Sequence, residues 1–470
     1  MNAPMVWVLI PALLSVVMLL LSRWGRLVTI LGTVTTLVLA ATAWLLPIKE
    51  QFFLGPWTIN FTDTWVILGR RFVLGSADRS ALVILYLAAA FWFGAAYVAR
   101  TSSLFVPLGL AMVALLTAAL GVEPFLYAAL LIEMAVLVSV PLLTPPDNQL
   151  GRGVLRYITL LTLGVPFILF AGWMMSGVEV DLVAEAFMRR ASYFIGLGFA
   201  LQLAVFPFHS WIPMLGKESH PYAAAFVFTM VPGAITLIVL SFFEGLPWFG
   251  ATPEVYVLMR VIGVVMVVFA GLWAAFQDNL GSMLGYAAIL EIGLSLVLIG
   301  ILAGDFESEH LGLFYAMLFP RGLGLGLWAL ALATLRTRTR SLNIIEIQGS
   351  GRVLPITTGA LILAQFSLAG IPLLASFPIR LPIWNELTRV SPMITYWALI
   401  GCMGLLFGGV RTLVVLATGE GEASWKITET REERIFLATG IILLLLLGLF
   451  PQIFLPFLAD LPFKFTQFLP

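Results

Sequence analysis

Fourteen runs of about twenty apolar residues dominate this sequence, and each is long enough to cross a hydrocarbon core roughly 30 Å thick. Hydrophobic residues make up 61% of the 470 residues and charged residues 11%, whereas soluble domains carry roughly 45–50% and about 25%. Because the backbone inside lipid must satisfy its own hydrogen bonds, each run is expected to be helical. The sequence therefore predicts an all-α, polytopic membrane protein with about 14 transmembrane helices.

The expected spans lie near residues 5–22, 27–47, 80–98, 104–120, 122–144, 153–175, 191–212, 221–243, 254–276, 283–303, 311–334, 354–377, 391–416 and 435–457. The connecting loops are short except for 48–79 and 417–434, so no soluble domain is expected. The first span lacks a cationic leader and a small-residue cleavage site, and we expect it to be retained.

Positive charge is distributed unevenly between the loops. Alternate loops, beginning with the one that holds Arg23 and Arg26, carry most of the arginines and lysines. Because such loops stay on the cytoplasmic side, the N-terminus is expected outside the inner (cytoplasmic) membrane. An even number of spans then places the C-terminus outside as well.

Composition excludes several classes of function. The formal net charge is zero, so no basic surface for nucleic acid is expected. The single cysteine, Cys402, rules out an internal disulfide and a cysteine-ligated iron–sulfur cluster. His209, His220 and His310 are too few and too scattered for bis-histidine haem sites. We therefore expect no cofactor, no metal and no catalytic redox centre in this chain.

Clustered prolines interrupt two of the spans. Pro207 and Pro213 fall in the seventh span, and Gly370 and Pro372 fall at the end of the twelfth. Proline removes a backbone donor and clashes with the preceding helical turn. Unwound backbone at this depth has to line a cavity or be buried in protein, so these breaks indicate a transport path.

The breaks occupy the same place in two sets of helices. Spans 4–8 and 9–13 number five each, and the break falls in the fourth span of each set. Two units with an odd number of helices have opposite topology, which predicts an inverted repeat. The expected parts are three N-terminal helices, the first repeat, the second repeat and a C-terminal helix, at residues 1–100, 101–245, 246–417 and 418–470.

Charged residues inside the spans show the same correspondence. Glu133 and Glu291 each lie in the middle of the second span of their set. Arg321 follows a proline inside the eleventh span, and Arg380 follows the break in the twelfth. A charge at the bilayer centre is costly, so it normally pairs, neutralises or faces water. Each glutamate is either a neutral, hydrogen-bonded packing residue or part of a polar axis.

The loop after the seventh span holds Lys217, Glu218 and His220. These residues form either an ordinary solvated loop or an entrance for protons on the inner side. A separate glycine repeat, Gly322 to Gly326, lies in an apolar span and predicts close helix packing rather than a nucleotide loop.

Three segments carry a resemblance to a known family. They are Phe206–Pro213 (FPFHSWIP), Gln277–Gly293 (QDNLGSMLGYAAILEIG) and Ser367–Arg380 (SLAGIPLLASFPIR). They resemble the antiporter-like membrane subunits of respiratory complex I, a family that also includes subunits of Mrp-type cation/proton antiporters and membrane-bound hydrogenases. The resemblance extends over spans 4–13.

The resemblance implies a proton path through the membrane. Glu133 matches the family's glutamate in helix 5. Gln202 stands where a lysine is expected in helix 7, and helix 8 has no basic residue beyond His220 at its start. The resemblance assigns the path to Glu133, Gln202, His209, Glu291, Arg321 and Arg380.

The second half of this path also departs from the family pattern. Arg380 occupies the helix-12 position, Arg321 lies at or beside the helix-11 position, and Glu291 replaces a usual histidine. Lysine exchanges protons once burial lowers its pKa, whereas arginine stays charged. The titratable groups that remain are Glu133, Glu291 and His209, together with water.

The resemblance implies a proton-conducting, non-redox subunit in the membrane arm of a complex I-type NADH:quinone oxidoreductase, which couples redox energy to proton translocation. Its expected partners are the other membrane-arm subunits, the lipid bilayer, and protons or Na⁺. Two alternatives stay open. One is a structural membrane-arm subunit without conduction. The other is an Mrp-like antiporter or an ion-driven uptake partner outside a redox complex.

Overall fold

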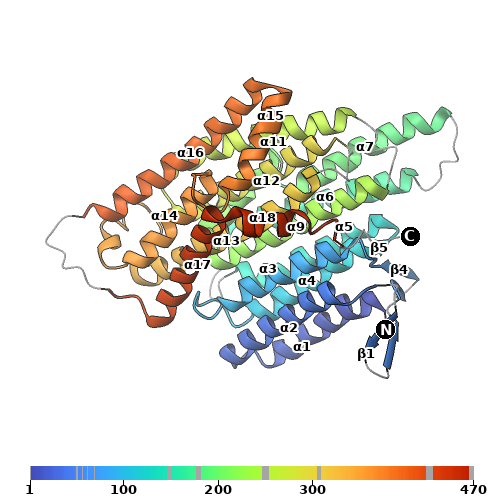
Figure 1. Ribbon diagram of the computed structural model, residues 1–470, viewed down its shortest axis with the longest axis horizontal. Coiled ribbons are helices and arrows are strands. Elements are labelled where there is room, and N and C mark those ends of the chain that lie inside the picture. Colours follow the sequence, from blue (N-terminus) through green and yellow to red (C-terminus); the bar gives the residue numbers. More distant parts are fainter. Residues whose placement is uncertain are drawn as a thin grey trace.

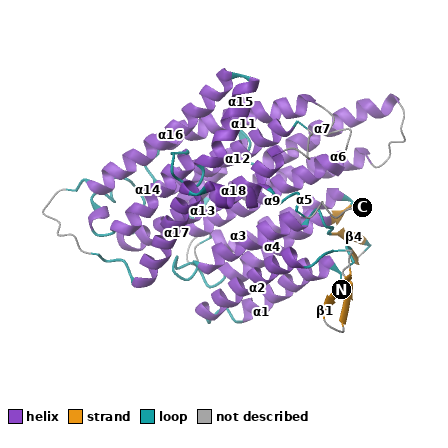
Figure 2. Cartoon of the chain, in the orientation of Figure 1, coloured by secondary structure: helices purple, strands orange, loops and turns teal. Residues whose placement is uncertain are grey.

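The computed structural model describes residues 2–48, 51–54, 57–60, 62–67, 69–144, 150–175, 182–245, 253–303, 309–419 and 427–464. Part of the long loop expected at 417–434 lies outside these residues. Helices fill most of the described chain, and they pack side by side in one bundle (Figures 1 and 2). The C-terminal helices α17 and α18 lie across the helices from the middle of the chain (Figure 1).

The described helices follow one another in this order. The first are η1 (Met5–Leu9, a π-helix), α1 (Ile10–Leu20), α2 (Gly25–Leu45) and α3 (Arg79–Gly94). The chain continues with α4 (Phe105–Gly121), η2 (Phe125–Tyr127), α5 (Ala128–Leu143), α6 (Arg152–Met175), α7 (Leu182–Gln202), η3 (Phe208–Ser210), α8 (Trp211–Glu218) and α9 (Pro221–Gly245). These are followed by α11 (Pro253–Ala275), α12 (Leu280–Leu302), α13 (Glu309–Thr339), η4 (Ser350–Arg352), α14 (Pro355–Ala369), α15 (Phe377–Val390) and α16 (Pro392–Ala417). The last described helices are α17 (Arg431–Leu449) and α18 (Pro451–Ala459).

Every expected span overlaps one of these helices. Within the described residues, eight helices are long and apolar enough to cross a membrane, and nine are if α17 and α18, bent by 86°, form one span. Four shorter apolar helices, among them α3 and α4, accompany them. The polytopic helical bundle is confirmed, while the number of 14 transmembrane helices stays a prediction.

The long loop expected at 48–79 contains short strands that the sequence did not predict. Five short strands, β1 (Gln51–Leu54), β2 (Trp57–Asn60), β3 (Thr64–Ile67), β4 (Arg70–Val73) and β5 (Val122–Glu123), form two antiparallel sheets. In the larger sheet Phe72 pairs with Trp65 on one side and Val122 on the other. Gly69, with φ of 75°, supplies the left-handed residue between β3 and β4. Strands of four residues or fewer are too short for periodicity to separate them from a loop.

Three helices form the buried centre of the bundle. Each long helix contains an apolar stretch of 18 residues. In α9, α12 and α13, 94%, 94% and 89% of the residues in this stretch are buried, compared with 33% in α2 and α6. Figure 1 shows these three helices in the middle of the molecule. Because the central helices have no face toward lipid, every polar side chain on them has to find a partner inside the protein.

Both predicted helix breaks are present in the structure. After α7 ends at Gln202, Pro207 lies in the irregular segment before η3, whereas Pro213 lies in the first turn of α8. A proline in the first turn removes no helical hydrogen bond, so α8 continues through it. The second break runs from Gly370 through Pro372 to the start of α15. The sequence did not indicate that α15 continues the chain as a helix, since its prolines favour a loop.

Gly370 ends α14 in a left-handed conformation, with φ of 83°. Its N–H group and that of Ile371 bond back to carbonyl groups in the last turn of α14. Only glycine adopts this conformation without strain. The chain therefore leaves α14 at a fixed direction, which sets where α15 starts.

Glycines let α8 and α12 approach to backbone contact. A Cβ atom placed on Gly216 would lie 2.3 Å from the carbonyl oxygen of Gly281, and one on Gly281 would lie 2.2 Å from that of Gly216. One turn along, a Cβ atom on Gly285 would lie 2.8 Å from Pro213 Cα. Gly281 and Gly285 of the segment at 277–293 are thus required by the packing of the broken helix against the central helix.

We expect Gly216→Ala to lower the free energy of unfolding in detergent by about 1–3 kcal/mol, because the added methyl group forces the two helices apart. Gly233→Ala in α9 is the matched control, since nothing lies within 4 Å of its Cβ position. That control should be neutral or stabilising by up to about 1 kcal/mol. Equal melting temperatures for the two variants would show that the close approach of α8 and α12 does not matter.

Candidate functional site

A buried ion pair joins two of the predicted residues at the centre of the bundle. Nη2 of Arg380, at the start of α15, donates to Oε1 of Glu291 in the middle of α12. Each side chain is 2% exposed. Nη1 of Arg380 also lies 3.5 Å from Sγ of Cys402 on α16. Three helices from the second half of the chain therefore meet at one guanidinium group.

The helix break provides the space for this guanidinium group. A Cβ atom on Gly370 would lie 3.0 Å from Arg380 Cδ and 3.1 Å from its Nη1. A larger residue there would push against the arginine in addition to straining the backbone. Gly370 thus ends α14, and because it has no side chain it also leaves room for Arg380 at the centre of the bundle.

A second arginine adjoins the ion pair. Arg321 on α13 is 1% exposed, and its Nη1 donates to Ser295 Oγ over 2.9 Å. Ser295 lies one turn after Glu291 on α12, and its hydroxyl group donates to the Glu291 carbonyl oxygen over 3.2 Å. Nε and Nη2 of Arg321 have no hydrogen-bond partner among the described residues. Two buried arginines thus share one carboxylate, Glu291, and the cluster carries a surplus positive charge.

Further buried polar side chains lie on α14 and at the break that follows it. The hydroxyl oxygens of Ser367 and Ser376 lie 3.4 Å apart across the break. Gln365 is fully buried; its Nε2 lies 3.5 Å from Met283 Sδ, and its Oε1 has no partner among the described residues. Sequence reasoning missed these residues and Ser295. The available signals were an amide within an apolar span and a hydroxyl one turn from a buried glutamate.

Gln202 lies apart from the charged cluster. It ends α7, is fully buried, and neither atom of its side-chain amide has a partner in the described part of the chain. Helix α9 contacts α7, and it also contacts α12 and α13. Between Pro221 and Phe243 this helix has no Asp, Glu, Lys, Arg or His. Buried polar groups without a protein partner are commonly bonded to ordered water in proteins.

Glu133 does not join Glu291 in the structure. It is half-buried on α5, and its Oε1 accepts a hydrogen bond of 2.5 Å from Thr162 on α6. Thr162 is exposed, which places this pair near the outside of the bundle, while Glu133 Oε2 has no partner in the residues described. The two glutamates of matched sequence position therefore have different surroundings.

His209 lies in an aromatic cluster. Its ring stacks on Phe206, with centroids 5.4 Å apart, and meets the edge of Phe269 at 4.8 Å. Nδ1 of His209 has no partner in the described chain. The structure places this histidine at the first helix break but outside the arginine–glutamate cluster.

The three residues proposed as an inner entrance differ in their surroundings. Lys217 is exposed. Oε2 of Glu218 accepts a hydrogen bond of 2.8 Å from the N–H group of Gly153, in the first turn of α6. Burial and the nearby Arg336 lower the pKa of His220 to about 4, so this side chain is neutral at pH 7. Glu218 thus stabilises a helix N-terminus, where a negative charge is favoured.

A buried ion pair beside a broken helix is characteristic of membrane transport proteins, because charges at this depth have to be paired or face a polar path. The model of the family described as NADH:quinone oxidoreductase/Mrp antiporter, transmembrane part, matches residues 155–408, which is more than half of the chain. The chain belongs to this family.

Individual relatives agree with the family match. The chain is 25% identical to NADH-quinone oxidoreductase subunit N of Cytophaga hutchinsonii over 277 residues, which are 56% of this chain and 58% of that relative. The match therefore covers less than two thirds of the relative's length. A chain of respiratory complex I from Thermus thermophilus with bound NADH has a similar fold, with a TM-score of 0.74 and 20% identity over 99% of both chains. The Mrp complex from Dietzia contains another, with a TM-score of 0.78 and 16% identity over 98% of this chain and 96% of that one.

Proposed function

We propose that this chain is an antiporter-like subunit in the membrane arm of a complex I-type NADH:quinone oxidoreductase, and that it conducts protons there while other subunits carry out the redox chemistry. The observation that supports this most is the buried Glu291 between Arg380 and Arg321 at a helix break. Family membership and the names of the relatives support the assignment to such a complex.

Within this proposal the two arginines act as fixed charges. Arginine does not lose its proton in proteins, so Arg321 and Arg380 hold a permanent positive potential at the centre. Glu291 is their counter-charge, and protonating it would leave two buried cations uncompensated. Proton movement in this half therefore proceeds through water beside the cluster, along Ser367, Ser376 and Gln365. The cluster transmits charge changes from a neighbouring subunit by electrostatics.

A structural subunit without conduction is the second candidate. Its support is the uncharged Gln202 and the absence of Asp, Glu, Lys, Arg and His from residues 221–243 of α9. An Mrp-like antiporter or an ion-driven uptake partner outside a redox complex is a third, supported by the family description, which includes Mrp antiporters, and by similarity of fold. Purification of the chain with its native partners separates these. Flavin and iron–sulfur proteins in the assembly support the first two, and a purely membrane assembly supports the third.

The proposal includes the placement of the chain in the inner membrane with both termini outside. Its support is a charge network at one end of the bundle, where Glu433 pairs with Arg100 and Arg338 at 3.2 Å each. These residues come from three segments that the charge pattern assigns to the inner side. The division into parts at residues 1–100, 101–245, 246–417 and 418–470 belongs to the same proposal, since the second and third parts each contain one broken helix.

We expect Glu133→Gln to leave assembly intact and to reduce proton transfer by about a hundredfold, the lower range for a proton-transfer group. Glutamine keeps the size of the side chain and can still accept the bond from Thr162, but it cannot ionise. The measurement is proton uptake by vesicles that contain the purified complex. Glu254→Gln, an exposed residue in the first turn of α11, is the control. Unchanged uptake in the Glu133 variant would remove this residue from the path.

A further inference from the structure

A large polar cavity opens at one end of the bundle, away from the arginine–glutamate cluster. It has a volume of about 1010 Å³ and lies between α2, the turn that joins α3 to α4, and the start of α17. Arginines and small hydroxyl residues form much of its lining, among them Arg23, Arg100, Arg431, Ser102 and Ser103. Such a lining is suited to an anion that is bound by charge and by several hydrogen bonds.

The acidic residues of this cavity are already paired. Glu433 forms ion pairs with two arginines, as described above, and closes the capping box of α17 with Thr430. Glu432 lies 3.6 Å from Arg26. Arg23 lies over the Trp24 ring, and in the described chain neither Arg23 nor Arg431 forms an ion pair. The cavity therefore has surplus positive charge.

Backbone groups add to this positive potential. Helices α2 and α4 both begin at the cavity, at Gly25 and Phe105. Neither N-cap residue, Trp24 or Leu104, accepts a hydrogen bond from the first turn with its side chain. The starts of these two helices supplement the arginines in attracting an anion, because the positive end of a helix dipole lies at its N-terminus.

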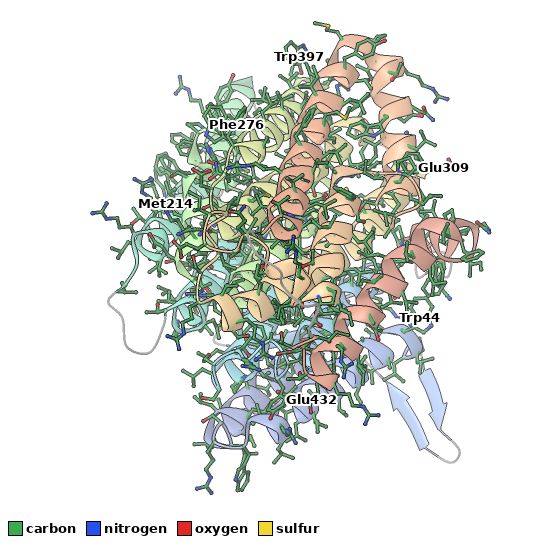
Figure 3. The ribbon with its side chains drawn as sticks, turned by 90° about the vertical axis from the view of Figure 1, so that its left-hand side faces the viewer. Trp44, Met214, Phe276, Glu309, Trp397 and Glu432 are labelled. Carbon is green, nitrogen blue, oxygen red and sulfur yellow. The ribbon has the colours of Figure 1, made fainter. Side chains whose placement is uncertain are left out.

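An apolar groove follows the same helices toward the middle of the membrane. It has a volume of about 670 Å³ and lies between α2 and α3 on one side and α13, α17 and α18 on the other. The polar cavity ends on α2 at Thr29, and the groove begins one turn later at Thr33. In Figure 3, Glu432 of the cavity and Trp44 at the far end of the groove lie along the boundary between the blue N-terminal and the red C-terminal helices.

The near part of the groove is as long as one lipid leaflet is thick. Half of a hydrocarbon core of roughly 30 Å is about 15 Å, which is about ten residues of a helix at 1.5 Å each. A chain that enters beside Thr29 therefore extends past Thr33 and Leu37 to about Ala40, all three of which line the groove.

We propose that this cavity binds the headgroup of an anionic phospholipid, with an acyl chain in the near part of the groove. Arg23, Arg100 and Arg431 would bind the phosphate, while Ser102 and Ser103 would donate hydrogen bonds to it. A free phosphate ion would occupy the polar cavity alone, whereas a phospholipid would also fill the adjoining apolar groove. A basic pocket between transmembrane helices at a membrane end is a recognised form of lipid site.

The test measures lipid retention by the purified full-length chain with native mass spectrometry, and binding by titration with phosphatidylglycerol or phosphatidylcholine in mixed micelles. The double variant Arg23→Gln/Arg431→Gln should weaken phosphatidylglycerol binding about thirty-fold, since each arginine near a membrane surface contributes about fivefold. Arg156→Gln/Arg434→Gln removes two exposed arginines that do not line the cavity, and it should bind normally. Ser102→Glu keeps every arginine but adds a negative charge, which repels the phosphate, so it should also weaken binding.

Three results would overturn the proposal. One is equal affinity for phosphatidylglycerol and phosphatidylcholine. The second is an equal loss of binding in the two double variants, which would indicate a general surface charge effect. The third is displacement of the bound lipid by inorganic phosphate at similar concentration, which would identify a free anion site. Leu37→Trp, which partly fills the groove, should weaken lipid binding without changing phosphate binding, and it separates the two parts of the site.

Discussion

Glu291→Gln is expected to cause the largest loss of stability of any single substitution at the centre of this protein. Glutamine keeps the shape of the side chain but removes the carboxylate that pairs with Arg380 and lies one helical turn from the Ser295 bound by Arg321. Removing one partner of a buried ion pair costs about 3–5 kcal/mol, because the remaining charge is left without compensation. Here two charges remain, so we expect a loss at or above the upper end of this range.

The measurement is the yield of folded protein and its thermal unfolding in detergent. Glu291→Asp keeps the charge on a shorter side chain and should recover a large part of the loss. Combining Glu291→Gln with Arg321→Met removes one of the stranded cations and should be more stable than Glu291→Gln alone. If Glu291→Gln unfolds at the same temperature as the unmodified chain, then Glu291 is neutral in the folded protein and is not the counter-charge.

Arg380→Ala is expected to cost about 3–5 kcal/mol for the same physical reason, with the carboxylate now left behind. The loss should be smaller than for Glu291→Gln, because Arg321 still balances the charge of Glu291. The substitution also removes the contact with Cys402 and leaves a void beside the break at Gly370. We expect the alanine variant to assemble poorly and to lose coupling.

Arg380→Lys separates the effect of the positive charge from the effect of the two contacts that the guanidinium group makes, with Glu291 and with Cys402. Lysine retains the positive charge but cannot reach Glu291 and Cys402 with two nitrogen atoms, so we expect a loss of stability of about 1 kcal/mol, while assembly and much of the activity are retained. Arg389→Ala, an exposed arginine on the same helix, is the control. Assembled yield and proton transfer have to be measured together. If Arg380→Ala equals the unmodified chain in both, Arg380 has no part in the polar axis.

The sequence by itself determined the kind of protein and the positions of its breaks. Fourteen apolar runs of this length are expected to cross the membrane as helices, because an unpaired backbone group in hydrocarbon is costly. Gly370 and Pro372 fixed the end of α14 through their own backbone restrictions, and Pro207 marked the irregular segment after α7. These are local effects, so they can be predicted from neighbouring residues in the sequence. The strands between residues 51 and 73 were missed because four residues do not establish a period.

Only the tertiary structure decided which charges meet. Glu133 and Glu291 hold equivalent positions in their sets of helices, yet Glu133 lies near the outside beside Thr162, while Glu291 lies at the centre beside Arg380. An apolar run shows that a helix crosses the membrane, but when all its faces are apolar it does not show which face meets which neighbour. Glu291 and Arg380 are 89 residues apart. Their pairing requires α12 and α15 to lie side by side, which follows from the direction in which the chain leaves Gly370 and from packing across the whole bundle.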